Sequence, residues 1–212
     1  MMQKTVTGLT GAAEPTDVTV ADVMGRPQRQ LRRTGHPPLP PPESATLFSG
    51  RHITTHTGTV TVTRPATEDD FGAVNMLHDR CSLDSRFSRY QSARRSLSAS
   101  EWRNLVHPDR GRSWVTHPVD SPHLLVASTH LMHTGHDQLA ELGILVEDTW
   151  QNFGLGTQLA RHAITQAHTL EVKAITVMTS RDNRRMLTIC KNLGAHSPRQ
   201  DGVTISFTLP VN

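Results

Sequence analysis

An apolar strand that leads into a glycine turn and a long helix is the feature that most restricts the fold of this chain. Residues 139–146 are almost entirely apolar, as in a buried β-strand, and the turn Gln151-Asn152-Phe153-Gly154-Leu155-Gly156 follows them. Apolar side chains then recur with a helical period over residues 154–170. The first turn of a helix presents unpaired backbone N–H groups and the positive end of its dipole. This order of elements therefore predicts a binding site for an anion where the helix begins.

The two glycines of the turn allow two interpretations. Gly154 and Gly156 lack the Cβ atoms that would keep a bulky diphosphate away from the backbone. The turn has no lysine and no P-loop spacing, and it does not match the G-x-G-x-x-G motif of dinucleotide-binding folds. The glycines are consistent either with phosphate binding or only with a tight connection between strand and helix.

The other periodic segments predict a mixed α/β domain. Strands are expected at residues 59–63, 114–115, 124–128, 174–178 and 203–209, where apolar and β-branched residues cluster or alternate. Helices are expected to begin near Thr67, near Ser98 and at Asp182 or Asn183. The clearest of these starts is the capping box Ser98-x-x-Glu101, in which each residue satisfies a backbone N–H near the other.

The first 56 residues differ in composition from the rest. They contain seven of the 13 prolines, including the run Pro37-Pro38-Leu39-Pro40-Pro41-Pro42, which favours extended polyproline II backbone. Phe48 is their only aromatic residue, so the segment has little side-chain surface to bury. We therefore expect residues 1–56 to be a disordered tail and residues 57–212 to form the folded domain. The arginines at positions 26–33 leave open that the tail docks on a partner or an acidic surface.

Charge and hydropathy argue against two classes of function. The chain has 22 Lys and Arg residues against 19 Asp and Glu, a formal net charge of +3, so nucleic-acid binding is not expected. No stretch approaches the roughly 20 consecutive apolar residues of a membrane span, and the N-terminus lacks the apolar segment of a secretory signal. We therefore expect a cytoplasmic protein without membrane contact. Cys81 and Cys190, far apart in sequence, are expected to be reduced thiols.

Several polar residues near the apolar strand have two possible roles. The run His130-x-x-His133-x-x-His136 has spaced imidazoles, but a zinc site needs further ligands in fixed geometry, so we expect a hairpin loop and no metal site. His162, on the predicted long helix, is expected at the surface. Glu147 and Asp148 are expected to be solvated turn residues.

Two segments together resemble a known superfamily. The turn at residues 151–156, between a strand and a helix, resembles the acyl-CoA pyrophosphate loop of GNAT-superfamily N-acetyltransferases. Asn183-x-x-Met186 with Leu193-Gly194-Ala195 resembles the next helix of that superfamily, whose Asn and apolar residue contact the pantetheine arm. The resemblance covers residues 57–210. It implies the GNAT fold, a single mixed, mostly antiparallel sheet flanked by helices, and acetyl-CoA as the cosubstrate.

A closer resemblance is to the acetyltransferase domain of bacterial protein-lysine acetyltransferases, the Pat-like group. Ala140-Glu141 at the head of the strand and the segment at residues 81–90 carry it. It implies that Glu141 is the general base that deprotonates the attacking amine. Many superfamily members have a tyrosine general acid where this chain has Cys190, and the Pat-like group likewise lacks that tyrosine. The proton donor for the departing thiolate is therefore left open.

The resemblance also implies which residues hold the cosubstrate. The Val146 N–H would polarise the thioester carbonyl, and the backbone amides of residues 151–157 would hold the pyrophosphate. The expected acetyl-CoA-binding residues are Leu145, Val146, Gln151, Asn152, Gly154, Leu155, Gly156, Thr157, Asn183 and Met186.

The sequence says least about the identity of the acceptor substrate. The Pat-like resemblance implies an amine acceptor, a protein lysine side chain. A small-molecule amine stays open as the acceptor, and so does a non-catalytic acyl-CoA-binding regulatory module. Arg86, Arg89, Arg94 and Arg95 form a basic patch near the place where such folds admit the acceptor. They would attract an acidic peptide or the nucleotide 3′-phosphate, or form a solvated face. The oligomeric state is not predicted.

Overall fold

A computed structural model describes residues 50–136 and 138–211. Residues 1–49, which make up most of the expected tail, lie outside the described part. None of the helices within the described ranges is long and apolar enough to cross a membrane.

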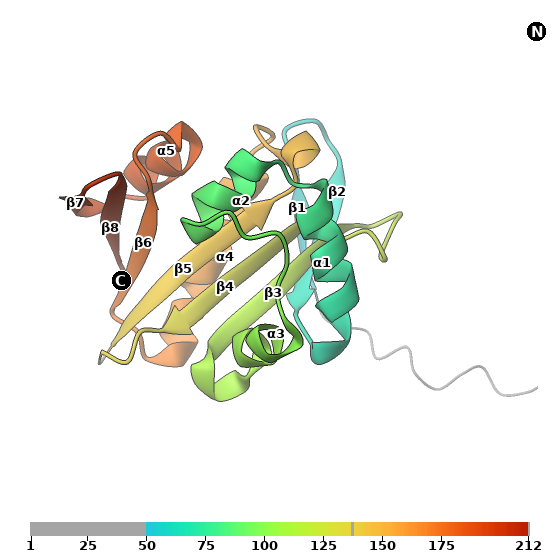
Figure 1. Ribbon diagram of the computed structural model, residues 1–212, viewed down its shortest axis with the longest axis horizontal. Coiled ribbons are helices and arrows are strands. Elements are labelled where there is room, and N and C mark those ends of the chain that lie inside the picture. The colour runs from blue at the N-terminus through green and yellow to red at the C-terminus, as the bar shows by residue number, and fades with distance from the viewer. Residues whose placement is uncertain (1–49, 137, 212) are drawn as a thin grey trace, which may run out of the picture. The chain divides into compact units, whose positions relative to one another are not determined.

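One sheet of eight strands organises this part of the chain (Figure 1). Its strands are β1 (Arg51–Thr54), β2 (Val60–Pro65), β3 (Gly111–Pro118), β4 (Ala127–His133), β5 (Leu139–Val146), β6 (Ala174–Ser180), β7 (His196–Asp201) and β8 (Thr204–Pro210). Their spatial order is β1-β2-β3-β4-β5-β6-β8-β7. Every neighbouring pair is antiparallel except β5–β6, which is parallel. The expected single mixed, mostly antiparallel sheet flanked by helices is confirmed.

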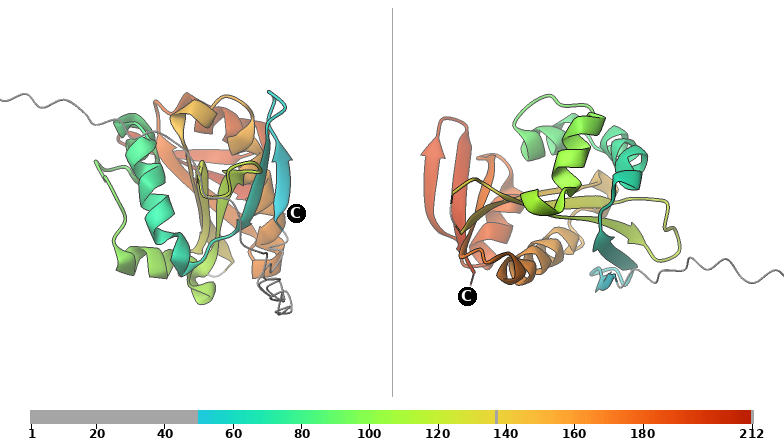
Figure 2. Two further views of the ribbon diagram at one scale, coloured as in Figure 1. Left: turned by 90° about the vertical axis from the view of Figure 1, so that its right-hand side faces the viewer. Right: turned by 90° about the horizontal axis from the view of Figure 1, so that it is seen from below.

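Helices cover both faces of the sheet. The α-helices are α1 (Phe71–Arg80), α2 (Leu83–Tyr90), α3 (Ala99–Val106), α4 (Leu155–Ala167) and α5 (Arg184–Asn192). Short 3-10 turns are η1 (Glu68–Asp70), η2 (Pro108–Arg110), η3 (Asp148–Trp150) and η4 (His168–Leu170). Helices α1, α2 and α3 lie on one face, and α4, which makes the crossover from β5 to β6, lies on the opposite face (Figures 1 and 2). Helix α5 contacts β6 and α4.

The alternation of side chains along the strands divides the core in two. Successive residues of a strand point to opposite faces of the sheet. Trp114 accordingly joins the apolar cluster that includes Leu159 of α4, whereas Val115 joins the cluster that includes Leu77 of α1 and Trp102 of α3. Each layer of helices therefore has its own apolar core against the sheet.

The first strand begins earlier than the sequence predicted. Arg51–Thr54 forms β1 and pairs with β2, although these residues were assigned to the tail ending at residue 56. The strand is short, and Ile53 is its one buried residue. A segment with a single apolar contact gives no periodic pattern, so only its pairing partner identifies it as a strand.

Two other elements also differ from the expectation. Strand β4 occupies residues 127–133 rather than 124–128, because those residues find partners in β3 on one edge and in β5 on the other. His130 and His133 are therefore strand residues and not part of a hairpin loop. Helix α2 was not predicted, although Leu83, Phe87 and Tyr90 recur with a helical period and Ser82 caps it; none of its residues is buried.

Candidate active site

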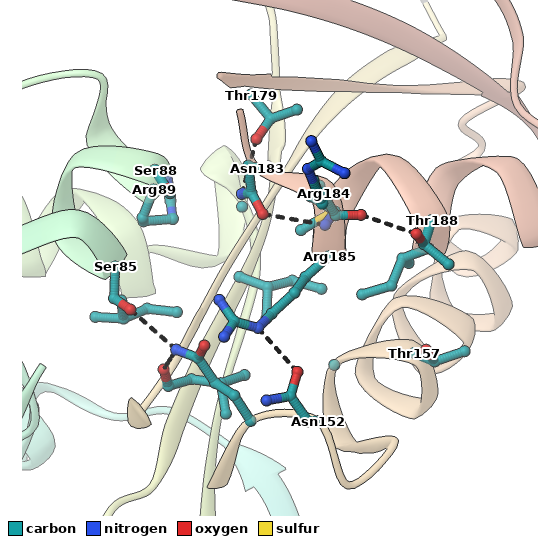
Figure 3. A pocket seen from close by; sticks show the side chains of 18 of the residues that line it. Ser85, Ser88, Arg89, Asn152, Thr157, Thr179, Asn183, Arg184, Arg185 and Thr188 are labelled. Carbon is teal, nitrogen blue, oxygen red and sulfur yellow. Dashed lines mark hydrogen bonds between the residues drawn. The ribbon is translucent and has the colours of Figure 1, made fainter. Parts of the chain in front are cut away.

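The parallel strands β5 and β6 separate soon after they pair. Only three residues of each strand are in register, from Leu139–Ala174 to Glu141–Thr176. Beyond that point a cavity of about 660 Å³ opens between them (Figure 3). We call it the β5–β6 cavity. It is lined by the second half of both strands, the loop before α4, the first turns of α5 and one side of α2.

The backbone of β5 presents polar groups to the β5–β6 cavity. The Glu147 N–H donates to the Val126 carbonyl, on the β4 side, at 2.9 Å. Because successive strand residues direct their backbone groups to opposite edges, the N–H and C=O of Val146 point away from β4. The Val146 carbonyl indeed accepts from Gln151 Nε2 at 2.8 Å. The N–H of Ile144, two residues earlier, points to the same edge, so a ligand lying along β5 finds hydrogen-bond donors there.

Helix α4 begins at this cavity with a glycine that no other residue replaces without strain. Gly154 has φ of 84°, in the left-handed region, and an added Cβ would lie 2.5 Å from Nε2 of His56. No side chain caps the helix. The N–H groups of its first turn are therefore available to an anion.

Two arginines of α5 line the same region, which Figure 3 shows from close by. The Nε of Arg185 donates to Oδ1 of Asn152 at 2.9 Å, and Arg184 also lines the cavity. Asn152 has φ of 67°, a conformation that asparagine tolerates better than most residues. Two cations beside a helix N-terminus make this end of the cavity suitable for phosphate groups.

Asn183 is the N-cap of α5 as well as a lining residue of the cavity. Its Oδ1 accepts from the Met186 N–H at 3.1 Å, and its Nδ2 donates to Oγ1 of Thr179 at 2.9 Å. The spacing Asn183-x-x-Met186 is thus explained locally by helix capping. Both polar atoms of the Asn183 side chain already have protein partners, so the residue shapes the wall between β6 and α5.

The loop after β5 fastens α2 to the wall of the cavity. The carboxylate of Asp148 accepts from the N–H and the Oγ of Ser82, each at 2.8 Å, and from Oγ of Ser85 at 2.8 Å. Ser85 Oγ in turn accepts from Nε2 of Gln151 at 2.9 Å. These hydrogen bonds lower the pKa of Asp148 although its partial burial opposes them. Asp148 is exposed in its turn, as expected, and these hydrogen bonds give it a structural role in addition.

The neighbouring carboxylate, Glu147, was also expected to be solvated. It pairs instead with Nε of Arg80 at 2.9 Å, and its side chain is only 12% exposed. Arg80 also donates to the Leu125 carbonyl at 2.5 Å. The pair ties α1 to the end of β5, so both carboxylates of the turn have structural roles.

Arg89 lies at the wall of the cavity where β5 and β6 diverge. Its guanidinium occupies the space in front of Gly143, since a Cβ added there would lie 2.1 Å from Cζ of Arg89. Burial lowers the pKa of Arg89, and the charges of Tyr90 and Glu141 oppose this shift. Glu141 is therefore an electrostatic neighbour of Arg89. It is half-buried and belongs to the last residue pair that joins β5 to β6.

The structure brings together most of the residues that the sequence assigned to acetyl-CoA. Those that line the β5–β6 cavity are Leu145, Val146, Gln151, Asn152, Gly154, Gly156, Thr157, Asn183 and Met186. Leu155 does not line it, because its side chain is 1% exposed and belongs to the core beneath α4. Glu141 lies beside the cavity, at the junction of the strands, and is not among the lining residues.

Sequence reasoning missed several residues that line the cavity. His56 was missed because it falls in the segment assigned to the tail, and Ser85 was missed because α2 was not predicted. Arg184 and Arg185 could have been found, since they directly follow Asn183 at the start of a predicted helix. Cations at that position would have indicated the phosphate side of the site.

The histidines and Cys190 have mainly packing roles. His130 is fully buried in β4 and its Nδ1 hydrogen-bonds Oγ of Ser113 at 2.8 Å. His162, expected at the surface, is 8% exposed and meets the edge of the Trp114 ring. Cys190 is fully buried, which raises the pKa of its thiol to about 11, and it does not reach the cavity. Over residues 50–136 and 138–211 no three His, Cys, Asp or Glu side chains form a group that could hold a metal ion.

Comparison with known proteins agrees with this geometry. The family model described as an acetyltransferase (GNAT) domain matches residues 61–196. Comparison with curated protein sequences finds none that matches.

Several solved structures are similar to the described fold. The GNAT domain of S. lividans PAT has 17% sequence identity and a TM-score of 0.68, over 76% of this chain and 96% of that one. YncA, a putative acetyltransferase from Salmonella typhimurium solved with its cofactor acetyl-CoA, has 12% identity and a TM-score of 0.59, over 72% of this chain and 94% of that one. A cAMP-binding acyltransferase from Mycobacterium smegmatis has 22% identity and a TM-score of 0.52, over 75% of this chain and 47% of that one. At these identities the likeness concerns the fold.

Proposed function

The chain belongs to the GNAT acetyltransferase family, and from that premise we propose that it transfers the acetyl group of acetyl-CoA to the side-chain amine of a protein lysine. The observation that carries the proposal is the β5–β6 cavity, which ends at the uncapped N-terminus of α4 with two arginines beside it. Its volume of about 660 Å³ lies in the range of pockets that hold a small molecule or cofactor. The lysine acceptor rests on the likeness of the segment at residues 81–90 and of Ala140-Glu141 to Pat-like enzymes.

The two ends of the cavity suit the two ends of the cosubstrate. The pyrophosphate is placed at the first-turn N–H groups of α4, between Gly154 and Thr157, with Arg184 and Arg185 on the opposite wall. The pantetheine arm then runs along the exposed edge of β5, where the N–H groups of Ile144 and Val146 point into the cavity. An amide that donates to the thioester carbonyl stabilises the negative charge that develops when the amine attacks.

Glu141 is the proposed general base. It lies at the junction of β5 and β6, where the acetyl end of a ligand running down the cavity would arrive. A carboxylate there accepts the proton that the lysine ammonium must lose before its nitrogen attacks the thioester. Cys190 is too deeply buried to protonate the departing thiolate, so that proton comes from another donor.

The decisive experiment combines binding and turnover on the full chain. Acetyl-CoA should raise the midpoint of thermal unfolding, because it binds the native state. Mass spectrometry should then detect acetylation of lysine peptides in a panel that also contains small amines. A thermal shift without any acetylated product would favour the non-catalytic acyl-CoA-binding module. Acetylation of small amines alone would replace the lysine proposal by a small-molecule acetyltransferase.

The substitution Glu141→Gln tests the proposed base. We expect kcat to fall by about 100-fold or more at neutral pH, because general-base catalysis contributes that much, while the thermal shift with acetyl-CoA is kept. Glu171→Gln, which changes an exposed carboxylate after α4, is the matched control and should keep kcat. A Glu141→Gln variant that turns over at the wild-type rate would assign the base to another group.

A further inference from the structure

A second cavity, of about 450 Å³, lies on the face of the sheet that α3 covers. We call it the α3 cavity. It is bounded by the end of α2, the α2–α3 connection, α3, Arg110 of η2 and the end of β4. Arg89 lines both this cavity and the β5–β6 cavity, so its side chain forms part of the partition between them. Met132, on the wall of the α3 cavity, is the β4 partner of Glu141.

The lining of the α3 cavity carries more positive than negative charge. It is lined by three arginines, Arg89, Arg94 and Arg110, and by one carboxylate, that of Glu101. The Glu101 carboxylate is already engaged. Its Oε1 pairs with Nη1 of Arg94 at 2.7 Å, and its Oε2 accepts from the N–H of Ser98 at 2.8 Å. Among the described residues neither Arg89 nor Arg110 forms an ion pair with a carboxylate, although the charge of Glu141 acts on Arg89 from the neighbouring strand.

The two remaining guanidiniums differ in their setting. The Nε of Arg89 is buried and has no hydrogen-bond partner among the residues that the structure describes. Arg110 is exposed at the rim, and its guanidinium makes no side-chain interaction within the described ranges. A buried guanidinium N–H without an acceptor is costly, and an anionic ligand that reaches it would supply the hydrogen bond that the described residues do not.

The wall of the cavity around these cations is held firmly. The Arg89 guanidinium lies 4.8 Å from the centre of the Tyr90 ring, and that of Arg94 lies 5.2 Å from it. The Tyr90 hydroxyl is 2.6 Å from Nε2 of His78, whose Nδ1 is 2.7 Å from the Val74 carbonyl. Since a carbonyl only accepts, Nδ1 carries the proton and Nε2 accepts from Tyr90. The cationic wall is thus preorganised.

The remaining lining is suited to an aliphatic stem. Leu97, Leu105 and Met132 supply apolar surface in the same cavity. A lysine ammonium that enters the cavity meets the guanidiniums of Arg89 and Arg110, which repel its charge. The same guanidiniums lower the pKa of the amine and so favour the neutral nucleophile. An acceptor that also carries a carboxylate offsets the repulsion through a charge-assisted hydrogen bond.

From these observations we propose that the α3 cavity binds the acceptor and selects an amine that has a carboxylate close to it. For the protein acceptor proposed above, on which this inference rests, the carboxylate is an Asp or Glu side chain that flanks the lysine. A free amino acid offers the same chemistry, and the test separates the two sources. Arg110 at the rim and Arg89 at the partition are the residues that bind this carboxylate.

The test compares acceptors that differ only in charge. Three peptides carry the same lysine flanked by Glu, by Gln or by Lys. Two further acceptors are free glutamate and glutamine amide, in which both carboxylates of glutamate are amidated. We expect kcat/KM for the Glu-flanked peptide to exceed that for the Gln-flanked peptide about tenfold at low salt. The preference should shrink as ionic strength rises. A preference for free glutamate over the peptides would identify a small-molecule source of the same carboxylate.

The charge reversal Arg110→Glu sharpens the test, because this exposed residue is replaced without disturbing the core. We expect it to invert the order, so that the Lys-flanked peptide becomes the better acceptor. The matched control is Arg103→Gln, on the exposed side of α3 and outside the cavity, which should keep the wild-type order. Equal kcat/KM values for all acceptors in the wild-type chain would overturn the proposal, as would an unchanged order in Arg110→Glu.

A binding measurement separates this inference from the proposed reaction. Peptides in which glutamine replaces the acceptor lysine are titrated against the acetyl-CoA-loaded wild type and the Arg110→Glu variant. If the wild type binds the Glu-flanked peptide more tightly than the Gln-flanked peptide and the variant does not, the result supports acceptor binding in the α3 cavity even if no acceptor is acetylated. In that case the proposed acetyl transfer is wrong, while the proposed acceptor site is kept. If the wild type binds the Glu-flanked and the Gln-flanked peptides equally, the proposed acceptor site is overturned, whether or not turnover is observed.

Discussion

At the scale of single residues, Gly154 lies at the proposed phosphate site, in a backbone conformation that requires glycine. Its φ of 84° and the 2.5 Å approach of His56 to the Cβ position both require glycine. We expect Gly154→Ala to lower the free energy of unfolding by about 1–2 kcal/mol, from the left-handed backbone alone. Displacement of His56 should also weaken acetyl-CoA binding. The measurements are denaturant unfolding and the thermal shift with acetyl-CoA.

Gly135 provides the control for that prediction. It has φ of 81° and no atom within 4 Å of a Cβ added there, so Gly135→Ala has the same backbone cost without a steric contact. Its thermal shift with acetyl-CoA should equal that of the wild type. If Gly154→Ala also keeps the full shift, the approach of His56 to this turn has no part in cosubstrate binding.

At the scale of elements, the placement of α2 depends on a few hydrogen bonds to the loop after β5. Asp148 accepts three of them, from Ser82 and Ser85. We expect Asp148→Ala to lower the free energy of unfolding by about 1 kcal/mol, since the bonds are exposed to water. It should raise the KM for acetyl-CoA several-fold, because α2 is one wall of the cavity.

The control for this element is Asp79→Ala, which removes an exposed carboxylate of α1 that takes no part in the hydrogen bonds between α2 and the loop. Steady-state kinetics with acetyl-CoA as the varied substrate, together with urea unfolding, distinguish the two variants. An Asp148→Ala chain with an unchanged KM would mean that α2 keeps its place through packing alone.

Most elements with a clear local signal could be predicted from the sequence. The capping box of Ser98 and Glu101 is present as expected, because both of its hydrogen bonds lie within four residues. The glycine turn before α4 was likewise found from local chemistry. Strand β1 was missed because only one of its residues is buried. Helix α2 was missed although its Ser82 N-cap and the spacing of Leu83, Phe87 and Tyr90 are local signals.

The candidate site was likewise predicted in part. The sequence named the lining residues of the loop from Gln151 to Thr157, because they belong to one motif. At the start of α5 it named Asn183 and Met186 but missed Arg184 and Arg185 between them. Arg89 was known only as one member of a basic patch. Its contact with Gly143, 54 positions later in the chain, depends on how α2 crosses β5, which no local pattern reveals.

At the scale of the whole molecule, buried histidines make the free energy of unfolding depend on pH. His78, His130 and His162 are each at most 8% exposed. Burial is the main cause that lowers the pKa of all three, for His130 well below its usual value. The ring nitrogens of His162 have no hydrogen-bond partner among the described residues. The native state therefore favours neutral imidazoles in both layers of the core.

The sign of the pH effect follows from these lowered pKa values. Below a pH of about 6.5 the unfolded chain binds more protons than the native chain, so the free energy of unfolding falls as pH falls. A histidine that stays neutral in the fold accounts for about 2 kcal/mol of this loss at pH 5. Asp70 and Asp148, whose pKa values are also lowered, add to the loss only in more acidic solution.

We therefore expect urea unfolding to give a clearly lower free energy at pH 5.0 than at pH about 7.5. His162→Phe replaces an imidazole whose ring nitrogens lack partners with an apolar ring of similar shape against Trp114. This variant should decline less steeply with acidification, and it should be at least as stable as the wild type at the higher pH because no unpaired polar group is buried. An equally steep decline in His162→Phe would show that residue 162 does not contribute to the pH dependence, and the loss would then belong to His78 and His130.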